Sequence, residues 1–268
     1  MKKILLGIFL LASSLAFSVE RILSYEETFL DKKTGKVHAK GEQIPYTGVI
    51  KNYKISEEDG VFEGKISFKN GVIDGLVELY YSNGKLAEMA TFKNGEKNGI
   101  QKTYYENGQI KMEVLYKNGK KDGIEKRYLT TGILVVEFPY KNGKLHGVVK
   151  EYDEISGKLK LEGPYKDGKI DGIVRDYYPN GKIKREETYK NDVRDGSMRV
   201  YYENGNLEKE FYYKNAKMDG IQKVYYPNGK IKTEANFKEN NLDGILKEYD
   251  ESGKITSEET YQNGNRIK

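Results

Sequence analysis

Glycine recurs along this chain at a step of 24 residues, which becomes 25 at one place. The first series comprises Gly75, Gly99, Gly123, Gly147, Gly172, Gly196, Gly220 and Gly244. A second series, from Gly84 to Gly253, keeps the same step and the same exception, and two aromatic series do so as well. Self-similarity at such a period is the signature of a repeat architecture, in which each unit contacts only its neighbours.

Each repeat unit has the pattern of a β-hairpin. In the unit 99–123, two runs rich in Tyr, Ile, Val and Thr, which favour strands, are separated by Asn107-Gly108. Asn-Gly is the strongest short hairpin signal and predicts a type I′ turn, in which both central residues have positive φ. A helix is excluded because each recurring glycine would cost it about 1 kcal/mol. We therefore predict an all-β fold, an elongated single-layer antiparallel sheet of tandem 24-residue β-hairpin repeats.

A two-residue turn at Asn107-Gly108 fixes which residues face each other in the hairpin. It places Lys102 opposite Glu113, and the same register pairs a basic residue with a glutamate in five further units. These pairs are Lys126 with Glu137, Arg175 with Glu186, Arg199 with Glu210, Lys223 with Glu234 and Lys247 with Glu258. Opposite charges across a strand pair contribute about 0.2–1 kcal/mol each and help to fix the register. We therefore interpret these pairs as structural.

The same register predicts how the aromatic residues pack. Tyr105 would face Ile110, and Tyr116 would face Gly99, where the missing Cβ leaves room for the ring. This pairing explains why a glycine series and an aromatic series share one step. A valine at the equivalent Gly123 is accordingly expected to clash with the facing ring.

The N-terminus has the pattern of a secretory signal peptide. Lys2 and Lys3 precede an apolar run from Ile4 to Phe17, which is shorter than the roughly 20 residues that a membrane span needs. We expect cleavage after Ser18, with residues 1–18 as the signal peptide and an exported mature protein, periplasmic or secreted. The chain contains no cysteine, so we expect it not to be lipid-anchored as a bacterial lipoprotein is.

Two segments follow the expected signal peptide. Residues 19–60 fit the repeat poorly, although Tyr46-Thr47-Gly48 is similar to a fragment of it. Terminal units of repeat proteins are usually atypical because they cap an open sheet edge. We therefore expect a divergent N-terminal capping segment at 19–60 and the repeat array at 61–268.

The charge balance argues against a nucleic-acid partner. Lys and Arg number 46 against 41 Asp and Glu, and removing Lys2 and Lys3 leaves 44 against 41, a net charge of +3. Interleaved charges of opposite sign cancel each other's long-range field, so no basic stripe for a phosphate backbone forms.

Taken together, these residues resemble a known repeat. Asp-Gly, then Tyr-Tyr-x-Asn-Gly-Lys, then Glu, then Tyr-Lys-Asn-Gly is similar to the bacterial variant of the MORN repeat, over residues 61–268. The match is strongest at 99–123, 172–189 and 220–237. Single substitutions interrupt it: the second tyrosine is replaced by Leu129, Asp153 and Asp250, and the glycine of the inter-unit turn by Asp192, Ala216 and Asn240.

The resemblance implies an elongated β-hairpin array that associates with proteins or membranes. Some bacterial relatives are named as antitoxin-like partners of secreted toxins, so an antitoxin-like role is also implied. Our leading hypothesis is an exported, non-catalytic scaffold or binding module with a protein partner. The alternatives are peripheral attachment to membrane lipid or cell-wall glycan, and an uncharacterised hydrolase.

The chemistry-bearing residues form no catalytic or metal-binding pattern. The chain has only His38 and His146, and His146 stands where other units have a turn aspartate. A metal site needs several converging ligands, whereas each repeated glutamate already has a basic partner. The segment 239–244 resembles a calcium loop only faintly. We therefore expect no catalytic, cofactor or metal site, and no enzyme.

Tyrosine is abundant, with 23 residues, and offers a candidate binding surface. We single out the second tyrosine of the Tyr-Tyr pair in five units: Tyr81, Tyr105, Tyr178, Tyr202 and Tyr226. Aromatic rings can stack on sugars or on partner side chains, but tyrosine at a fixed repeat step more often packs across strands. Both roles stay open for these residues.

Overall fold

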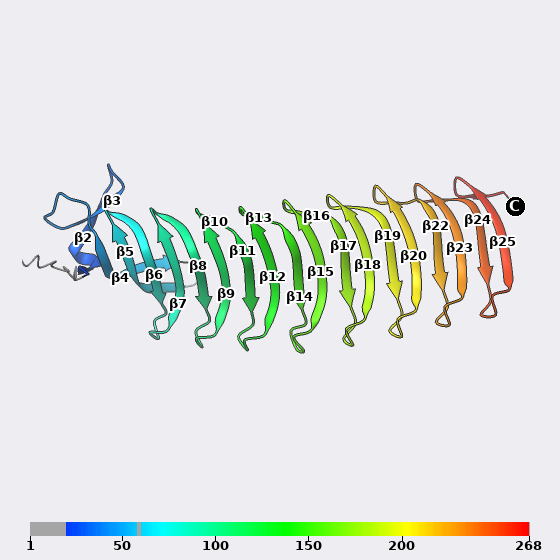
Figure 1. Cartoon of the computed structure of the whole chain (residues 1–268), viewed down its shortest axis with the longest axis horizontal. Helices are drawn as coiled ribbons and strands as arrows, with labels where there is room; N and C mark the ends of the chain where they lie inside the picture. The colour runs from blue at the N-terminus through cyan, green and yellow to red at the C-terminus, as the bar shows by residue number, and fades with distance from the viewer. Residues whose placement is uncertain (1–19, 58–59, 268) are drawn as a thin grey trace, which may run out of the picture.

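The structure is a computed structural model that describes residues 20–57 and 60–267. The expected signal peptide, residues 1–18, lies outside the described residues. Figure 1 shows a single row of curved strands that runs from one end of the molecule to the other in chain order. Within the described ranges, no helix is long and apolar enough to cross a membrane.

The strands are short, and many units add a two-residue strand beside the inter-unit turn. Their bounds are β1 (Ile22–Ser24), β2 (Thr28–Asp31), β3 (Lys36–Ala39), β4 (Gly48–Glu57), β5 (Gly60–Lys69), β6 (Val72–Tyr80), β7 (Leu86–Lys93), β8 (Glu96–Tyr104), β9 (Ile110–Lys117), β10 (Lys120–Lys121), β11 (Gly123–Tyr128), β12 (Leu134–Lys141), β13 (Lys144–Leu145), β14 (Gly147–Tyr152), β15 (Leu159–Lys166), β16 (Lys169–Ile170), β17 (Gly172–Tyr177), β18 (Ile183–Lys190), β19 (Val193–Tyr201), β20 (Leu207–Lys214), β21 (Lys217–Met218), β22 (Gly220–Tyr225), β23 (Ile231–Lys238), β24 (Asn241–Tyr249), β25 (Ile255–Gln262) and β26 (Asn265–Arg266). A single 3-10 turn, Tyr25–Glu27, lies between β1 and β2.

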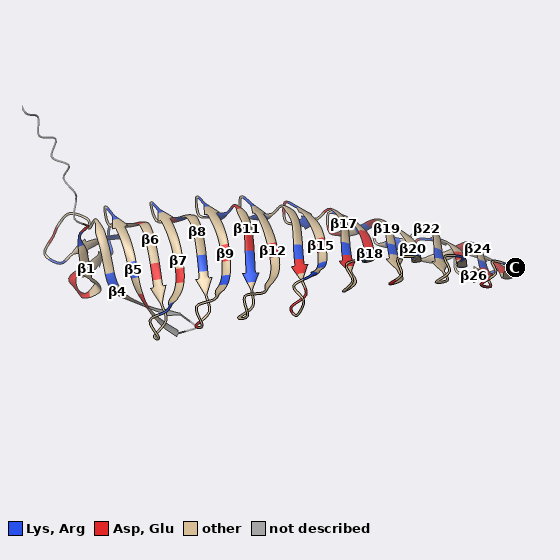
Figure 2. Ribbon diagram, turned by 60° about the horizontal axis from the view of Figure 1, so that its bottom comes forward, with Lys and Arg blue, Asp and Glu red and all other residues tan. Residues whose placement is uncertain are grey.

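Over the described residues, the main sheet has 24 strands. From β4 onward the strands pair antiparallel with their neighbours in the chain, and β10 and β11 both pair with β9 as two parts of one strand. The predicted elongated antiparallel sheet of tandem hairpins is therefore confirmed. In Figure 2 the N-terminal strands are seen along their length and the C-terminal ones nearly end-on, so the sheet twists along the array, as extended sheets do.

Consecutive units are joined by type I′ turns. Between β9 and β10, Asn118 and Gly119 have φ of 49° and 72°, the two positive values that this turn requires. Three units lack the glycine, yet Asp192, Ala216 and Asn240 keep φ of 70°, 64° and 72°. These departures from the repeat therefore change the residue without changing the turn.

The turn inside each unit differs from the prediction. Gly108 N–H donates to the carbonyl oxygen of Tyr105 at 2.7 Å, and Gly108 has φ of 92°. Tyr104, rather than Tyr105, pairs with Ile110. The predicted two-residue turn at Asn107-Gly108 is wrong, because a longer loop closed by a left-handed glycine is another favourable way to join two strands.

The charge pairs nevertheless lie in the predicted register. A bulge at the end of β8 restores the offset, and all six basic residues face the predicted glutamates. Their nitrogen-to-oxygen distances run from 2.9 Å in Arg175–Glu186 to 4.0 Å in Lys126–Glu137. Figure 2 shows the basic and acidic segments at similar heights on successive strands. We call these six pairs the charge ladder.

Gly99 faces Tyr116, as predicted, but for a different reason. Gly99 has φ of 132°, and a Cβ there would lie 3.0 Å from the Thr91 side chain of the preceding unit. Gly123 likewise has φ of 144°, and its Cβ would lie 3.1 Å from the Leu115 side chain. The glycine therefore permits a left-handed backbone and close approach of the preceding unit. The expected clash with the facing ring is wrong.

The two faces of the sheet differ in exposure, because successive residues of a strand point to opposite sides. On the face that we call inner, Gln101 and Val114 are buried, with 6% and 2% of their surface exposed. On the outer face, their neighbours Ile100 and Leu115 are 51% and 43% exposed. The charge ladder lies on the outer face.

Residues 20–47 pack against the N-terminal end of the sheet. β1 pairs in parallel with β4, and the buried Tyr46 hydroxyl lies 2.8 Å from the carbonyl oxygen of Arg21. β2 and β3 form a separate hairpin, which is joined to the array by a 2.9 Å bond from Val37 N–H to Gly71 O. An apolar cluster joins this segment to the first strands of the array: it contains Ala39 and Tyr46 together with Ile50, which is fully buried.

Candidate binding surface

The five candidate tyrosines form a row along the side of the sheet where the intra-unit turns lie. Each stands at the start of its turn and is half-buried. Each hydroxyl donates to a backbone carbonyl oxygen 23 residues further on, in the next unit: Tyr81 to Tyr104, Tyr105 to Tyr128, Tyr178 to Tyr201, Tyr202 to Tyr225 and Tyr226 to Tyr249. The row therefore links each unit to the next, and its contact with a partner stays a prediction.

A lysine lies over three of these rings. The Nζ atoms of Lys111, Lys184 and Lys232 lie 5.9, 5.8 and 5.7 Å from the ring centres of Tyr105, Tyr178 and Tyr226, respectively. An ammonium over a ring face is attracted by the ring's quadrupole. Each such ring thus occupies a slot with a carbonyl acceptor at one end and a cation above it. We call this place the tyrosine slot.

The first tyrosine of each pair lies on the outer face beside the charge ladder. The hydroxyls of Tyr128, Tyr152 and Tyr177 donate to Glu113, Glu137 and Glu162 at 3.1, 3.0 and 2.8 Å. Burial, followed by the hydrogen bond to the carboxylate, raises the pKa of each of these three tyrosines to about 12. The ladder carboxylates Glu113 and Glu137, and Glu162 at the equivalent place, are therefore each held by a phenol of the next unit as well.

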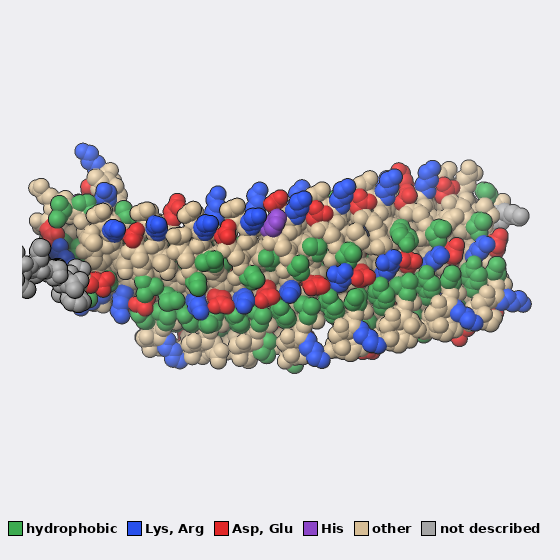
Figure 3. Space-filling model, viewed as in Figure 1, with side chains coloured by type: hydrophobic (Ala, Val, Ile, Leu, Met, Phe, Trp, Pro, Cys, Tyr) green, Lys and Arg blue, Asp and Glu red, His purple; other side chains and the backbone are tan. Residues whose placement is uncertain are grey.

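An exposed apolar row on the outer face was missed by the sequence reasoning. The residue directly after the first-series glycine is aliphatic in seven units, with 39% to 51% of its surface exposed: Leu76, Ile100, Ile124, Val148, Ile173, Ile221 and Ile245. In the remaining unit, where Ser197 takes this place, Tyr212 pairs with it and is 38% exposed. Figure 3 shows hydrophobic side chains spaced along this face above the ladder. We call this the outer apolar row.

The signal for this row was available in the sequence. The predicted register already placed Ile100 opposite Leu115, on the same face as the charge ladder. Apolar residues that share a face with paired charges are expected to stay exposed in a single-layer sheet, because no second layer covers them.

A basic row lies along the opposite side of the array, at the inter-unit turns. The residue before each turn asparagine, or its substitute, is an exposed lysine in eight successive units: Lys69, Lys93, Lys117, Lys141, Lys166, Lys190, Lys214 and Lys238. Figure 3 shows basic side chains spaced along this side, with acidic ones between them. We call these residues the lysine row.

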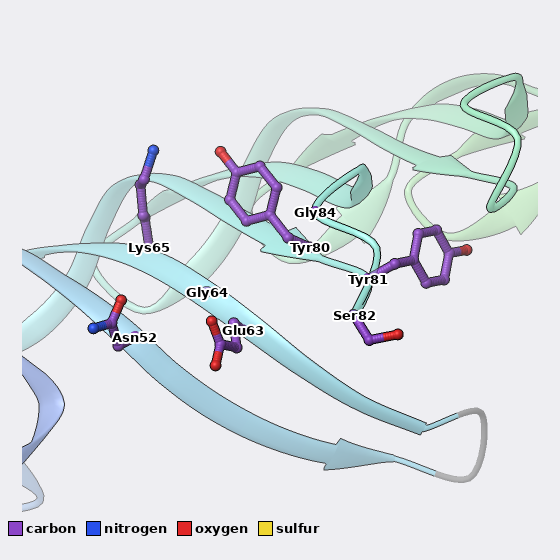
Figure 4. A pocket seen from close by; sticks show the side chains of 8 residues that line it. All are labelled: Asn52, Glu63, Gly64, Lys65, Tyr80, Tyr81, Ser82 and Gly84. Carbon is purple, nitrogen blue, oxygen red and sulfur yellow. The ribbon is translucent and has the colours of Figure 1, made fainter.

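A polar hollow of about 580 Å³ opens near the N-terminal end of the array (Figure 4). Lys65 and Tyr80 stand on one side of the strands, with the amine 5.3 Å from the ring centre, while Tyr81 points away from them. Asn52 and Glu63 lie on the adjoining strands. These groups can hydrogen-bond a polar ligand, but Asn52 and Glu63 lie before the first matched repeat, so the hollow as a whole is not repeated along the array.

Buried charge on the inner face is paired. Glu125 is fully buried, with Arg127 Nε at 2.6 Å and Lys121 also in contact. Glu187 is 3% exposed and lies 2.8 Å from Arg194 Nε. Buried carboxylates are tolerated when they are paired in this way.

The histidines lie apart from these acids. His38 stacks on Phe29 with ring centres 5.4 Å apart, and His146 Nδ1 lies 3.5 Å from Asp167 Oδ1. Within the described part of the chain, no group of three or more His, Asp or Glu side chains is placed to hold a metal ion.

A family model for the MORN repeat variant matches eight consecutive segments, which together make up more than half of the chain: 73–94, 97–118, 121–142, 145–167, 170–191, 194–215, 218–239 and 242–263. The chain belongs to the MORN repeat variant family. No match was found among curated proteins. MORN repeats commonly mediate protein or membrane-lipid interactions, and the family is typically non-catalytic. Eight tandem MORN repeats indicate a binding or scaffold module.

Proposed function

We propose that this MORN-repeat protein is an exported, non-catalytic module that binds a protein partner along its outer face. The outer apolar row carries the proposal. A single exposed apolar residue is common on soluble proteins, but here the same exposed position recurs in seven of the eight units and is aligned along one face, as expected of an extended interaction site. The charge ladder beside the row supplies alternating charges, which contribute specificity and association rate more than affinity.

An antitoxin-like role, with a secreted toxin as the partner, is the specific form of this proposal that the family resemblance supports. Export rests on the expected signal peptide at residues 1–18. The five candidate tyrosines lie at the intra-unit turns along one side of the sheet and would extend the contact.

The test is capture with immobilised mature protein, residues 19–268, from envelope extract and culture fluid, with washes at low and high salt. We expect one stoichiometric polypeptide that survives high salt. A variant with Ile100→Gln, Ile124→Gln and Ile173→Gln should retain that polypeptide about tenfold less well or worse. The matched control is Ile44→Gln, because Ile44 is 72% exposed but lies outside the array. Equal capture by all three proteins would overturn the proposal.

A second candidate function is attachment to an anionic surface, membrane lipid or cell-wall glycan, and the lysine row favours it. Each basic residue near an anionic membrane contributes about 1 kcal/mol, and salt screens this attraction. Flotation with anionic vesicles and sedimentation with cell-wall glycan, each abolished by high salt and by charge reversal of Lys117, Lys141 and Lys166, would favour this function. Turnover in a hydrolase screen that is lost on replacing one glutamate or histidine would overturn the non-catalytic assignment.

A further inference from the structure

The unit 145–167 departs from the repeat at its intra-unit turn. Asp153 stands where Tyr105 and Tyr178 stand in other units, and one extra residue in this turn accounts for the 25-residue step. Asp153 Oδ1 accepts hydrogen bonds from Ser156 N–H at 2.7 Å and from Ile155 N–H at 3.2 Å. The side chain is therefore turned into its own loop and does not reach toward the next unit.

A cavity of about 350 Å³ lies at this turn, between the loop that contains Asp153, Ile155 and Lys158 and a second group of residues, Leu159, Lys160, Tyr177, Tyr178 and Pro179. In the five units that keep the second tyrosine, its ring fills the equivalent place and its hydroxyl bonds to a carbonyl of the next unit, as Tyr105 does to Tyr128 at 2.7 Å. The equivalent carbonyl here is that of Tyr177. Because aspartate supplies no ring, the cavity corresponds to an unfilled tyrosine slot.

The cation of the slot is nonetheless present. Lys160 is the repeat equivalent of Lys111, Lys184 and Lys232, which lie 5.7 to 5.9 Å from tyrosine rings in their own units. Lys160 is exposed and lines the cavity. The slot thus keeps its cation and its backbone acceptor, and Leu159 gives it an apolar wall. What it lacks is the phenol itself.

The loop beside the slot also presents an apolar contact. Ile155 is 91% exposed, more than the other large hydrophobic residues of the described chain. The hydrogen bonds to Asp153 hold this loop in one conformation, so the exposure of Ile155 is built into the turn. Exposed apolar side chains next to a concave pocket are typical of the centres of protein interfaces.

We propose that this slot receives a tyrosine side chain of the partner protein, which supplies the ring that Asp153 does not. The proposal rests on the proposed function, because it names one contact of the same binding module. A tyrosine satisfies all three parts of the slot at once: the ring packs on Leu159, its face receives Lys160, and its hydroxyl donates to the carbonyl of Tyr177. The partner residue beside that tyrosine would contact Ile155.

The first test uses N-acetyl-tyrosine amide as a probe, titrated into the mature protein and followed by amide chemical shifts. We expect saturable shifts confined to residues 153–160 and 177–179, and about tenfold weaker binding of N-acetyl-leucine amide. Asp153→Tyr should fill the slot from within and abolish the shifts. Tyr105→Asp should create a second slot under Lys111 and add a second set of saturable chemical shift changes around it. Both variants use residues that the repeat itself tolerates at this position, and a thermal melt checks that they fold.

Absence of saturable shifts in the wild-type protein, or shifts that persist in Asp153→Tyr, would overturn the proposal. The second test repeats the partner capture with Asp153→Tyr, which should retain the polypeptide about tenfold less well. Undiminished capture would overturn the partner contact while leaving the proposed function intact. Probe binding without any captured polypeptide would instead overturn the proposed function and assign the slot to a free phenolic compound.

Discussion

The N-terminal end of the array and its C-terminal half share one repeat, but different interactions stabilise them. At the N-terminal end, Ile50, Ile66 and Val77 are at most 7% exposed and belong to one apolar cluster. Among the described residues that follow Val149, one hydrophobic residue is buried: Ala235, with 6% of its surface exposed. Cross-strand ion pairs, tyrosine hydroxyls and turn hydrogen bonds take the place of apolar packing there.

The difference shows which parts of the repeat specify the fold. Turn glycines and linking tyrosines recur in both regions, whereas buried apolar residues are concentrated at the N-terminal end and the charge ladder begins at Lys102. Because each unit contacts only its neighbours, a well-packed end can hold adjoining units that could not fold alone. We therefore expect the C-terminal units to open first, at a free energy well below that of the N-terminal end.

The border between the two regions gives the largest expected effect. Glu125 is fully buried, and its cations Lys121 and Arg127 are 27% and 50% exposed. Replacing both cations with leucine leaves an uncompensated buried carboxylate, so we expect a loss of about 3–5 kcal/mol in the free energy of unfolding. Denaturant unfolding measures this change.

The matched control removes the acid instead. Val77 and Val149 occupy the position of Glu125 in other units, so Glu125→Val should stay within about 1 kcal/mol of the wild-type protein. Equal losses for the two variants would mean that the volume of the side chain, rather than its charge, matters at this position. Charge pairing would then not distinguish how the two regions are stabilised.

The apolar cluster at the N-terminal end gives the next largest effect. Ile50 has no exposed surface. We expect Ile50→Ala to lose about 2–5 kcal/mol and to raise amide exchange across β4 to β7. Ile245→Ala, at 40% exposure in the C-terminal half, should change stability by about 0.5 kcal/mol or less. A comparable loss for Ile245→Ala would contradict the proposed difference between the regions.

A gain in stability is expected at one turn of the C-terminal half. Ala216 has φ of 64°, a left-handed conformation that costs a non-glycine residue about 1–2 kcal/mol. Ala216→Gly should therefore stabilise the protein by about 1 kcal/mol, measured as a shift of the denaturant midpoint. Asp192→Gly is the control, because Asp192 Oδ1 accepts a 2.7 Å bond from Ile170 N–H that glycine would lose. A larger gain for Asp192→Gly would show that backbone strain is not the cause.

Much of the fold could be predicted from the sequence because its determinants repeat. The step of 24 residues, the strand pairing and the charge ladder follow from residues such as Lys102 and Glu113 that recur in register. The intra-unit turn could not be predicted, since Asn-Gly fits both a two-residue turn and the observed longer loop closed by Gly108. The tyrosine slots were hidden as well: a bond from Tyr105 to the next unit depends on how neighbouring hairpins stack, which pairing within one hairpin does not determine.

The smallest effect concerns alkaline pH and the middle of the array. Burial and the bonds to Glu113, Glu137 and Glu162 raise the pKa of Tyr128, Tyr152 and Tyr177 to about 12 in the folded protein, against a reference value of 10.0. A raised folded-state pKa means that the unfolded chain releases these protons first. The stabilisation is therefore complete below pH 10 and is lost as the pH rises through 12.

In a pH titration followed by tyrosinate absorbance, a fraction of the tyrosines should therefore ionise only near pH 12. Over the same pH range, the backbone amides of β11 to β18 should lose their protection from hydrogen exchange. The variant with phenylalanine at these three positions keeps the rings and removes the hydroxyls, so its high-pH fraction should shrink while its stability near neutral pH changes little. A high-pH fraction of unchanged size in that variant would mean that the hydrogen bonds from these tyrosines to Glu113, Glu137 and Glu162 are not what raises their pKa values. The link between the tyrosines of one unit and the charges of the preceding one would then have to come from packing alone.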